Sequence, residues 1–375
     1  TAALYFVLRP ANSYRILSWC VLLFIAALTH AYLLAMAGAL WVIDTIERER
    51  LQKRPPLNVM MELACITGLV GFVVWQAGYF AVGGGLGGAG FGHYRMHPLA
   101  PIDASGWSYV LDDIPQPAAT LEGFNFLGLG VLFLAVFAVI PSLASRTDCR
   151  LGLERRPFLG LGLLAFVLFS LSHRIGIQTL WFEVPLPDFM THIAGIFKSS
   201  GRFFWPVFYM IYLAVFCLIV RGYSKGIAIT ALGLGVLVQV LDTGAYWTAV
   251  RDSAMQERSY SWDVGMESGF WEEVAARYEK TRALPVVNKG RNWRAISYYS
   301  GVHGFPTSAV YLARLDPAGL ASAREETEQM IDSGRYQSDT LYFVKEDLVP
   351  VIASNLDKNE DLLARIDDYY ILTPG

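Results

Sequence analysis

Long apolar runs dominate the sequence up to Val250 and set the strongest limit on what the chain can fold into. A helix that crosses the hydrocarbon core of a bilayer needs about 20 mostly apolar residues. Only 17% of the 375 residues are charged, whereas a soluble protein carries about a quarter. The pattern predicts a polytopic α-helical membrane domain. We expect about six spans, at Tyr14–Ile43, Leu57–Phe80, Phe126–Leu143, Phe158–Leu171, Phe203–Val220 and Gly226–Val240.

The sequence changes character near Tyr246–Tyr260, and from Arg251 onward charged residues recur throughout. Short strand-like runs alternate here with helical patterns, which favours a small, mostly parallel three-layer sheet. The expected strands are Leu284–Val287, Ser308–Ala313, Thr340–Val344 and Tyr369–Leu372. We therefore expect residues 1–250 to form the transmembrane helical domain and residues 251–375 a small soluble α/β domain that binds an acceptor or a partner. The expected helices are Phe270–Tyr278, Pro317–Ser333 and Leu348–Asn355, and a binding face at strand ends could comprise Asn288, Trp293, His303 and Asp339.

Charge and cysteine content exclude several classes of protein. With 30 basic and 33 acidic residues the net charge is −3, so the sequence gives no sign of a nucleic-acid partner. The four cysteines lie in or beside apolar runs, which argues against a disulfide scaffold and against a cysteine-based metal site. No cofactor is evident from the sequence. A divalent metal stays open, although no ligand spacing supports one.

Basic residues in short loops predict the orientation, because cytoplasmic loops retain Lys and Arg. Three such clusters mark inner loops: Arg48, Arg50, Lys53 and Arg54; Arg146, Arg150, Arg155 and Arg156; and Arg221 with Lys225. Six crossings then place the first residue and the C-terminal domain on the same outer, periplasmic side. An exterior start without a signal-peptide pattern predicts that the sequence is the C-terminal portion of a longer protein.

The first outer segment, from Val82 to Asn125, is rich in glycine, aromatic and acidic residues. Its glycine run lacks the phosphate-loop motif, so a flexible turn is the simpler interpretation. Tyr94 and its aromatic neighbours could stack on sugar rings or form an aromatic belt at the headgroup level. Asp113 and Glu122 are carboxylates on the outer side, where a general base would have to lie; a solvated loop charge is the alternative for each.

The second outer segment carries the most specific pattern. Apolar residues at helical spacing from Phe189 onward predict a short amphipathic helix that lies in the membrane interface. Lys198 and Arg202 follow, four residues apart, with Ser199 and Ser200 between them. This group suits a phosphate, since Arg offers a planar fork and Lys a mobile point charge. Two basic side chains that snorkel to lipid headgroups are the alternative.

Three further polar residues fall near predicted membrane boundaries or within a span. His192 could add a donor to the same anion or have no role. Asp242 closes the sixth expected span and could line an outer cavity together with Gln239 and Thr243. His30 lies near the middle of the first expected span, where an interhelical hydrogen bond is the usual reason for a polar side chain.

Three segments carry a resemblance to a known group of proteins: Phe91-Gly-His-Tyr, Glu122-Gly-Phe-Asn-Phe-Leu-Gly-Leu-Gly and Phe197-Lys-Ser-Ser-Gly-Arg-Phe-Phe-Trp-Pro. They resemble motifs of an uncharacterised family of bacterial polytopic inner-membrane proteins. That family in turn is similar to the GT-C superfamily of membrane glycosyltransferases, which take a sugar from a polyprenyl-phosphate donor at the periplasmic face.

The resemblance implies roles for particular residues. In GT-C enzymes a basic residue at the outer end of a later span holds the lipid phosphate, and Lys198 and Arg202 fit that role. The catalytic carboxylate lies in the outer loop after the first span, to which no residue here is matched. Asp113 and Glu122 stay candidates, with the main base expected upstream of this chain. Tyr94 and Asn125, from the first two segments, join His192, Ser199, Ser200 and Asp242 as candidate donor-binding residues.

The sequence thus predicts a GT-C-type glycosyltransferase in the bacterial inner membrane. Its expected partners are membrane lipid, a polyprenyl-phosphate sugar donor and a glycan or lipid acceptor. A non-catalytic scaffold in envelope polysaccharide assembly would explain the missing catalytic signature equally well, and a transporter or flippase is a further alternative. A transporter should show broken helices and internal repeats, of which the sequence offers little sign.

Overall fold

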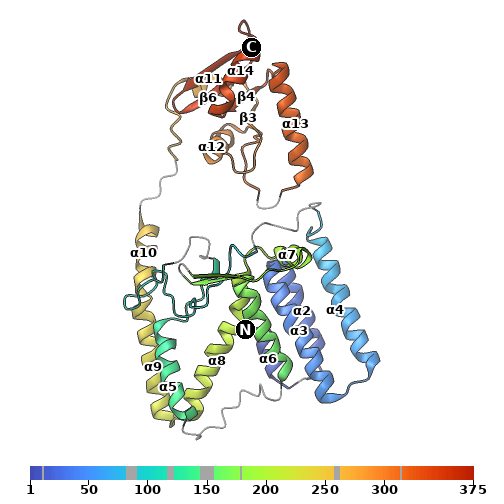
Figure 1. The fold of residues 1–375 in the computed structure, drawn as a ribbon, viewed down its shortest axis with the longest axis vertical. Coiled ribbons are helices and arrows are strands. Elements are labelled where there is room, and N and C mark those ends of the chain that lie inside the picture. Colours follow the sequence, from blue (N-terminus) through green and yellow to red (C-terminus); the bar gives the residue numbers. More distant parts are fainter. Residues whose placement is uncertain are drawn as a thin grey trace. The chain divides into compact units, whose positions relative to one another are not determined.

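The computed structural model describes residues 1–10, 12–81, 91–115, 122–143, 156–177, 180–256, 262–312 and 315–375. The chain divides into two compact units (Figure 1). The helical unit comprises Thr1–Phe80 and Leu86–Gln256, and the C-terminal unit comprises Ala81–Gly85 and Glu257–Gly375. The glycine-rich run at 82–90 and the expected inner loop at 144–155 lie outside the described residues.

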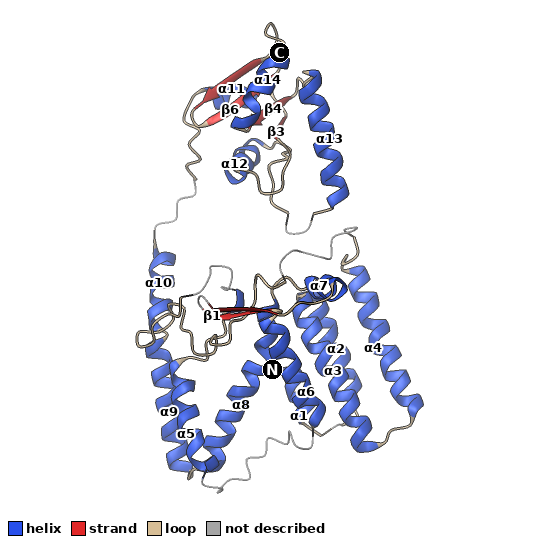
Figure 2. Cartoon of the chain, in the orientation of Figure 1, coloured by secondary structure: helices blue, strands red, loops and turns tan. Residues whose placement is uncertain are grey.

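Helices make up most of the helical unit (Figure 2). They are α1 (Ala2–Leu8), α2 (Arg15–Thr29), α3 (Ala31–Gln52), α4 (Pro56–Gln76), α5 (Leu129–Leu143), α6 (Pro157–Leu171), α7 (Asp188–Gly195), η3 (Ser200–Phe204), α8 (Trp205–Gly222), α9 (Lys225–Asp242) and α10 (Gly244–Met255). A two-stranded antiparallel hairpin, β1 (Arg174–Ile177) and β2 (Leu180–Glu183), follows α6.

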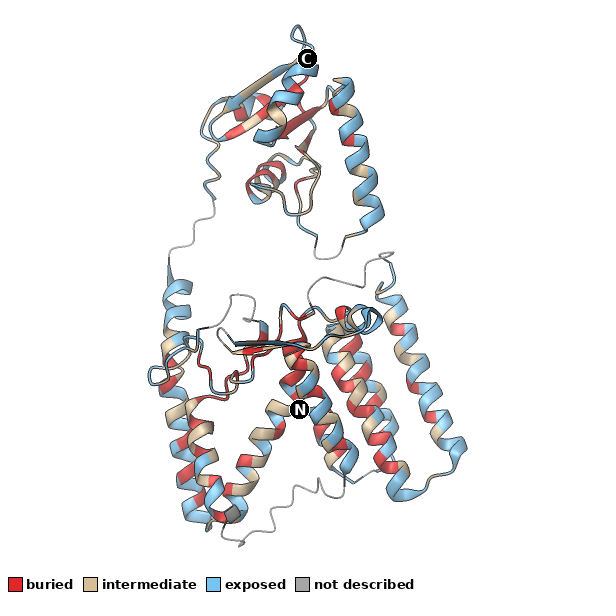
Figure 3. Ribbon diagram, in the orientation of Figure 1, coloured by how far each residue is buried: buried red, intermediate tan, exposed pale blue. Residues whose placement is uncertain are grey.

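Three helical stretches among the described residues are long and apolar enough to cross a membrane: Pro56–Gln76, Ser200–Gly222 and Lys225–Asp242. Arg15–Thr29, Leu129–Pro141 and Pro157–Leu171 are apolar but shorter. Many large apolar side chains on these helices are exposed rather than packed inside the unit, for example Phe72, Val136 and Val236 (Figure 3). Such surfaces need an apolar environment, so the structure is compatible with a membrane protein.

The first expected span, Tyr14–Ile43, is two helices rather than one. His30 has an extended backbone (φ −166°, ψ 134°) that ends α2 and begins α3, and its Nδ1 accepts a hydrogen bond from the Tyr32 N–H at 3.2 Å. The two helices lie side by side (Figure 1). The prediction of a single span with His30 near its middle is therefore wrong, and the exposed His30 caps α3 where an interhelical hydrogen bond was expected. The stretch is longer than one crossing needs, and His30 serves as a helix cap.

The hairpin of α2 and α3 changes the number of membrane crossings from which we inferred that the chain starts on the outer side. Because α2 runs back along α3, it begins at the end where α3 passes into α4. Several buried charges gather at that end. Arg48 donates to Asp44 at 3.0 Å and to Glu62 at 3.1 Å, and Arg54 donates to Glu62 at 2.7 Å. The N-terminus of α2 thus lies at the end of the helical unit that carries Arg48 and Arg54, which we call the basic end. The argument that the chain starts on the outer side therefore no longer holds.

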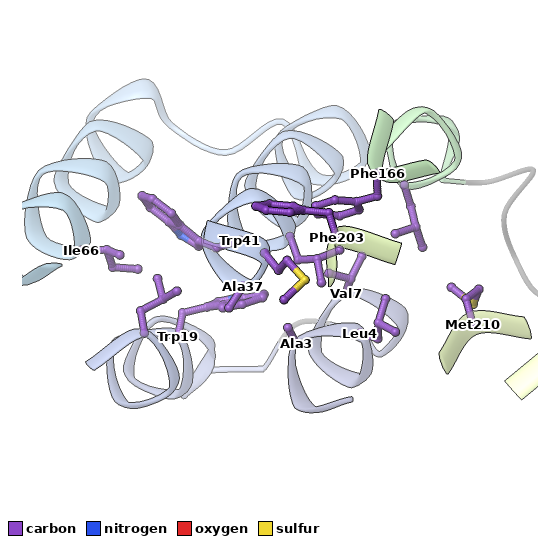
Figure 4. Packing of buried hydrophobic residues seen from close by; sticks show 14 residues of the cluster. Ala3, Leu4, Val7, Trp19, Ala37, Trp41, Ile66, Phe166, Phe203 and Met210 are labelled. Carbon is purple, nitrogen blue, oxygen red and sulfur yellow. The ribbon is translucent and has the colours of Figure 1, made fainter. Parts of the chain in front are cut away.

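The apolar core of the helical unit lies between α1, α2, α3, α4, α6, η3 and α8 (Figure 4). Trp19 is fully buried there, and its indole N–H donates to the Asp44 carboxylate at 2.8 Å, which ties the core to the basic end. Phe166 and Phe203 close the same cluster from α6 and from η3. Because Phe203 follows Arg202 directly, the core fixes the backbone at the predicted phosphate site.

The C-terminal unit is a four-stranded sheet with helices on both faces (Figure 2). The strand order is β3-β4-β6-β5. Its elements are α11 (Phe270–Arg277), β3 (Lys280–Leu284), α12 (Trp293–His303), α13 (Pro317–Ser333), β4 (Thr340–Val344), η4 (Glu346–Leu348), α14 (Val349–Asn355), β5 (Leu362–Ile366) and β6 (Tyr369–Thr373). Alternate residues of β4 face opposite ways: Leu341 packs toward α11 and α12, and Tyr342 toward α13 and α14.

The expectation of a mostly parallel sheet is wrong. Only β3 and β4 pair in parallel, whereas β6 pairs antiparallel with both β4 and β5. A tight turn with Asp367 at φ 49° joins β5 to β6, and a hairpin of this kind produces antiparallel neighbours. The expected strand from Ser308 is also absent from the described sheet, where Thr307 forms only an isolated bridge with Thr281.

Candidate functional site

Three chain segments far apart in the sequence meet in the helical unit. The Gly201 N–H donates to the Tyr94 carbonyl at 3.2 Å, and the Asn125 amide donates to the carbonyls of Gly123 at 2.9 Å and Gly201 at 3.2 Å. We call this place the junction and define it by Tyr94, Glu122, Gly123, Asn125 and residues 198–202. These are the three segments that carry the family resemblance.

Glycine is required where the segments cross. A Cβ atom on Gly201 would lie 2.6 Å from Gly123 Cα, and one on Gly123 would lie 2.2 Å from the Arg95 carbonyl oxygen. Both contacts are with backbone, which cannot move aside as a flexible side chain could. The two glycines therefore permit a close approach that no other residue allows.

The charged side chains of the junction are linked to one another. Arg202 forms an ion pair with Glu122, and the Ser199 hydroxyl donates to the same carboxylate at 3.1 Å. The Ser199 N–H donates to the Tyr32 hydroxyl at 2.7 Å, which connects the junction to the start of α3. The side chains of Arg202 and Glu122 are 30% and 38% exposed, so this pair faces a surface of the unit.

Aromatic rings lie beneath both basic side chains. Lys198 Nζ lies 5.2 Å from the centre of the Tyr94 ring, and the Arg202 guanidinium lies 5.4 Å from that of Tyr32. Cations are attracted to ring faces at these distances. Lys198 is exposed and forms no ion pair with any described residue. The Ser200 hydroxyl is fully buried and has no hydrogen-bond partner in the described part of the chain.

The remaining candidates lie elsewhere. Asp242 accepts from the Ser108 hydroxyl at 2.8 Å and from the Tyr109 N–H at 3.0 Å, so it anchors the loop that contains these two residues to the end of α9. Asp113 is exposed and accepts from the Gly106 N–H at 2.6 Å. His192 is exposed on α7. Of the ten candidates, the structure brings seven together and places these three apart.

The structure also reveals a buried pair that the sequence reasoning missed. His97 Nε2 lies 2.9 Å from Asp103 Oδ2, and both side chains are almost completely buried. Asp103 also accepts from the backbone N–H groups of Ser105 at 3.3 Å and Ile114 at 3.1 Å. The available signal for this pair in the sequence was the presence of His97 and Asp103 in the same segment between two predicted spans. Their pairing fixes the chain that follows Tyr94.

Burial lowers the pKa of His97 below its ordinary value of 6.5, against the opposing attraction of Asp103. The folded protein thus prefers the neutral imidazole, while the unfolded chain binds the proton more readily. We expect stability to decline as the pH falls below about 6.5. Thermal unfolding of wild type and His97→Asn, measured at intervals from about pH 7.5 to pH 5, should show a shallower decline in the variant. Equal pH slopes would contradict this role of His97.

The expected binding face of the C-terminal unit does not form. Asp339 lies at the amino end of β4 and pairs with Lys280 at 2.6 Å, whereas Trp293 begins α12, beyond the carboxyl end of β3. The Asn288 amide bonds to the backbone of Leu312, and the His303 ring stacks on Phe305. Within the described ranges no group of three or more His, Cys, Asp or Glu residues could hold a metal ion.

Two family models match the chain. Residues 1–244 match the domain of unknown function DUF6311, and residues 270–374 match the DUF6311 C-terminal domain. No curated protein and no solved structure matches the chain.

Proposed function

The chain belongs to the DUF6311 family, and on that premise we propose that its helical unit is a membrane glycosyltransferase of the GT-C type. The proposed donor is a polyprenyl-phosphate-linked sugar. The observation that carries the proposal is the placement of Lys198 and Arg202. Both project from the junction of three segments, and the segment after Arg202 enters α8, one of the helices long enough to cross a membrane.

The geometry around Arg202 suits a phosphate monoester or diester. A guanidinium has five N–H donors, and the contact to Glu122 uses only part of this set. The remaining donors can form a planar fork with two phosphate oxygens, while Lys198 contributes a mobile positive charge four residues away. The buried Phe203 and Phe204 hold the backbone that presents Arg202. A fixed Arg and a mobile Lys are a suitable pair for a lipid phosphate.

The proposed reaction transfers one glycosyl group. The oxygen of an acceptor hydroxyl forms a bond to the anomeric carbon of the sugar, and the bond from that carbon to the phosphate oxygen breaks. The electron pair leaves with the polyprenyl phosphate, and the hydroxyl proton passes to a carboxylate base. Lys198 and Arg202 stabilise the charge on the departing phosphate.

Neither candidate carboxylate is well placed to be that base. Glu122 is engaged by Arg202 and Ser199, and Asp113 is exposed and bonds within its own loop. We therefore assign Glu122 the task of positioning Arg202. The Glu122–Arg202 pair also favours a second candidate function, a membrane scaffold that binds a lipid phosphate without transferring sugar.

Transfer from a radiolabelled polyprenyl-phosphate sugar by the full-length protein in membranes discriminates between the two functions. Transfer that is lost in Arg202→Ala supports the glycosyltransferase. Donor binding without transfer supports the scaffold. If Glu122→Gln abolishes transfer while donor binding is retained, Glu122 is the base and our positioning assignment is wrong.

We also propose that the protein lies in a bacterial inner membrane, with the basic end of the helical unit in the cytoplasm and the C-terminal unit in the periplasm. The support is the cluster of Arg15, Arg48, Arg54 and Arg156 at one end of the helices, which the positive-inside rule assigns to the cytoplasm. Since α2 and α3 form a hairpin, residues just before α2 should be cytoplasmic as well.

Cysteine labelling in intact cells tests this topology. In a background without the four native cysteines, we expect Ser322→Cys to react with an impermeant maleimide, and Ser13→Cys and Ser224→Cys to stay unlabelled until the membrane is permeabilised. Both Ser13 and Ser224 are exposed in the helical unit. Labelling of Ser13→Cys together with Ser322→Cys would restore the six-span count, and labelling of Ser224→Cys alone would invert the orientation.

A further inference from the structure

The C-terminal unit contains a cavity of about 440 Å³, within the range of roughly 300–1,000 Å³ that is usual for small-molecule sites. It lies where β3 and β4, the one parallel pair among the described strands, reach their carboxyl ends. The loop that leads into α12 forms a second wall, and the turn between β5 and β6 forms a third. Crevices outside the carboxyl ends of parallel strands are a common place for ligands.

Side chains of both charges line this cavity. Arg291, Lys345 and Arg365 supply donors, and Glu346 and Asp368 supply acceptors. Lys345 already pairs with Asp347 at 2.5 Å, and Arg365 with Asp368 at 3.1 Å. Arg291 is exposed and forms no ion pair with any described residue. The positive charges of two of the three basic side chains are thus balanced by neighbouring carboxylates. The lining of the cavity is therefore neither uniformly positive nor uniformly negative.

An amide and apolar side chains complete the lining. Asn292 adopts a left-handed backbone (φ 60°) just before α12, and its side chain makes no capping hydrogen bond. Its amide can therefore both donate and accept toward a ligand. Tyr369 and Tyr370 also line it, but their side chains point to opposite faces of the sheet: Tyr369 is buried against Trp271 and Phe343, and the Arg365 guanidinium lies 5.6 Å from the Tyr370 ring. Apolar residues at the end of β3 and in the loop that follows it, Leu284, Pro285 and Val287, lie beside the polar groups of both kinds.

We propose that this cavity binds a neutral sugar unit of a glycan. Each sugar hydroxyl both donates and accepts, so it is matched by a lining that offers Arg291 as donor, Glu346 as acceptor and Asn292 as both. The apolar face of a pyranose ring can pack on the apolar side chains of Leu284, Pro285 and Val287. A simple anion would meet the carboxylates of Glu346 and Asp368, and a simple cation would meet three basic side chains. This inference stands on the cavity alone and does not rest on glycosyl transfer by the helical unit.

Saturation-transfer NMR with the full chain in lipid nanodiscs tests the proposal. The probes are glucose, galactose, mannose, rhamnose and N-acetylglucosamine, together with inorganic phosphate in a separate titration followed by phosphorus NMR. We expect at least one sugar to bind, and we expect Arg291→Ala and Glu346→Gln each to weaken it at least tenfold. Asn292→Gly, which keeps the left-handed backbone and removes only the side chain, should weaken it as well.

Two controls locate the signal. Arg335→Ala changes an exposed arginine of the same unit outside the cavity and should leave sugar binding unchanged. Arg202→Ala should also leave it unchanged, because a signal that depends on Arg202 belongs to the helical unit. The proposal is overturned if no sugar binds, if the cavity variants bind as well as wild type, or if phosphate alone binds at the cavity. If the cavity binds no sugar, the proposal of glycosyl transfer by the helical unit is unaffected, because transfer is measured separately with the lipid-linked donor.

Discussion

Arg202→Ala is expected to weaken binding of a polyprenyl phosphate by a factor of about 10–10², the loss that follows removal of hydrogen bonds to a charged group worth about 1.5–3 kcal/mol. The physical reason is the fork of parallel N–H donors, which alanine lacks entirely. Arg202→Lys should fall between wild type and alanine, since a point charge keeps the attraction and loses the bidentate geometry. The measurement is equilibrium binding of a labelled polyprenyl phosphate to the full chain in nanodiscs.

Matched variants distinguish specific binding at the junction from general attraction of the lipid to positive charge. Arg251→Ala removes an exposed arginine on α10 and should not change the affinity. Lys198→Ala combined with Arg202→Ala should abolish specific binding. If the double variant binds as tightly as wild type, both side chains are ordinary snorkelling groups that contact lipid headgroups.

Gly201→Ala is expected to disrupt the junction itself. The new Cβ would lie 2.6 Å from Gly123 Cα and 3.0 Å from the Met96 nitrogen, so backbone segments must separate to admit it. Overpacking of this kind costs about 1–3 kcal/mol, and the cost rises when backbone rather than side chain must move. We expect a lower unfolding temperature in nanodiscs and a loss of donor binding, although no charge has changed.

Gly233→Ala on α9 is the control for that substitution, because a Cβ at Gly233 meets no atom within 4 Å. It should be neutral or stabilising, since alanine exceeds glycine in helix propensity by about 1 kcal/mol. Equal unfolding temperatures for Gly201→Ala and Gly233→Ala would show that the segments do not cross as closely as the structure has them.

Local patterns in the sequence predicted much of the helical unit. Apolar runs located α4, α8 and α9, which are long enough to cross a membrane, and the pattern after Pro187 located α7. The break at His30 was not predicted, because apolar residues continue on both sides of it and hydropathy does not register a single capping residue. That one residue changes the number of helices and the end at which α2 begins.

The junction was predicted in its residues but not in its contacts. The segments were recognised by resemblance, whereas the hydrogen bond from Ser199 to Glu122 joins positions 77 residues apart, which no local pattern can reveal. The same limit hid the ion pair between Glu122 and Arg202, on which our proposal that Glu122 positions Arg202 rests. In the C-terminal unit a mostly parallel sheet with a strand from Leu284 was expected, whereas β3 ends at Leu284 and neither the β3–β4 pairing nor the β5–β6 hairpin was predicted.

The central claim is that the junction recognises a lipid through its phosphate. Paired binding of a polyprenyl phosphate and the matching polyprenol to the wild-type chain in nanodiscs tests it most directly, because the two ligands share one apolar chain and differ only in the charged group. We predict that the phosphate form binds at least a hundredfold more tightly, and that this difference disappears in the Lys198→Ala, Arg202→Ala double variant. Equal affinity of the wild-type chain for the two lipids would contradict the claim.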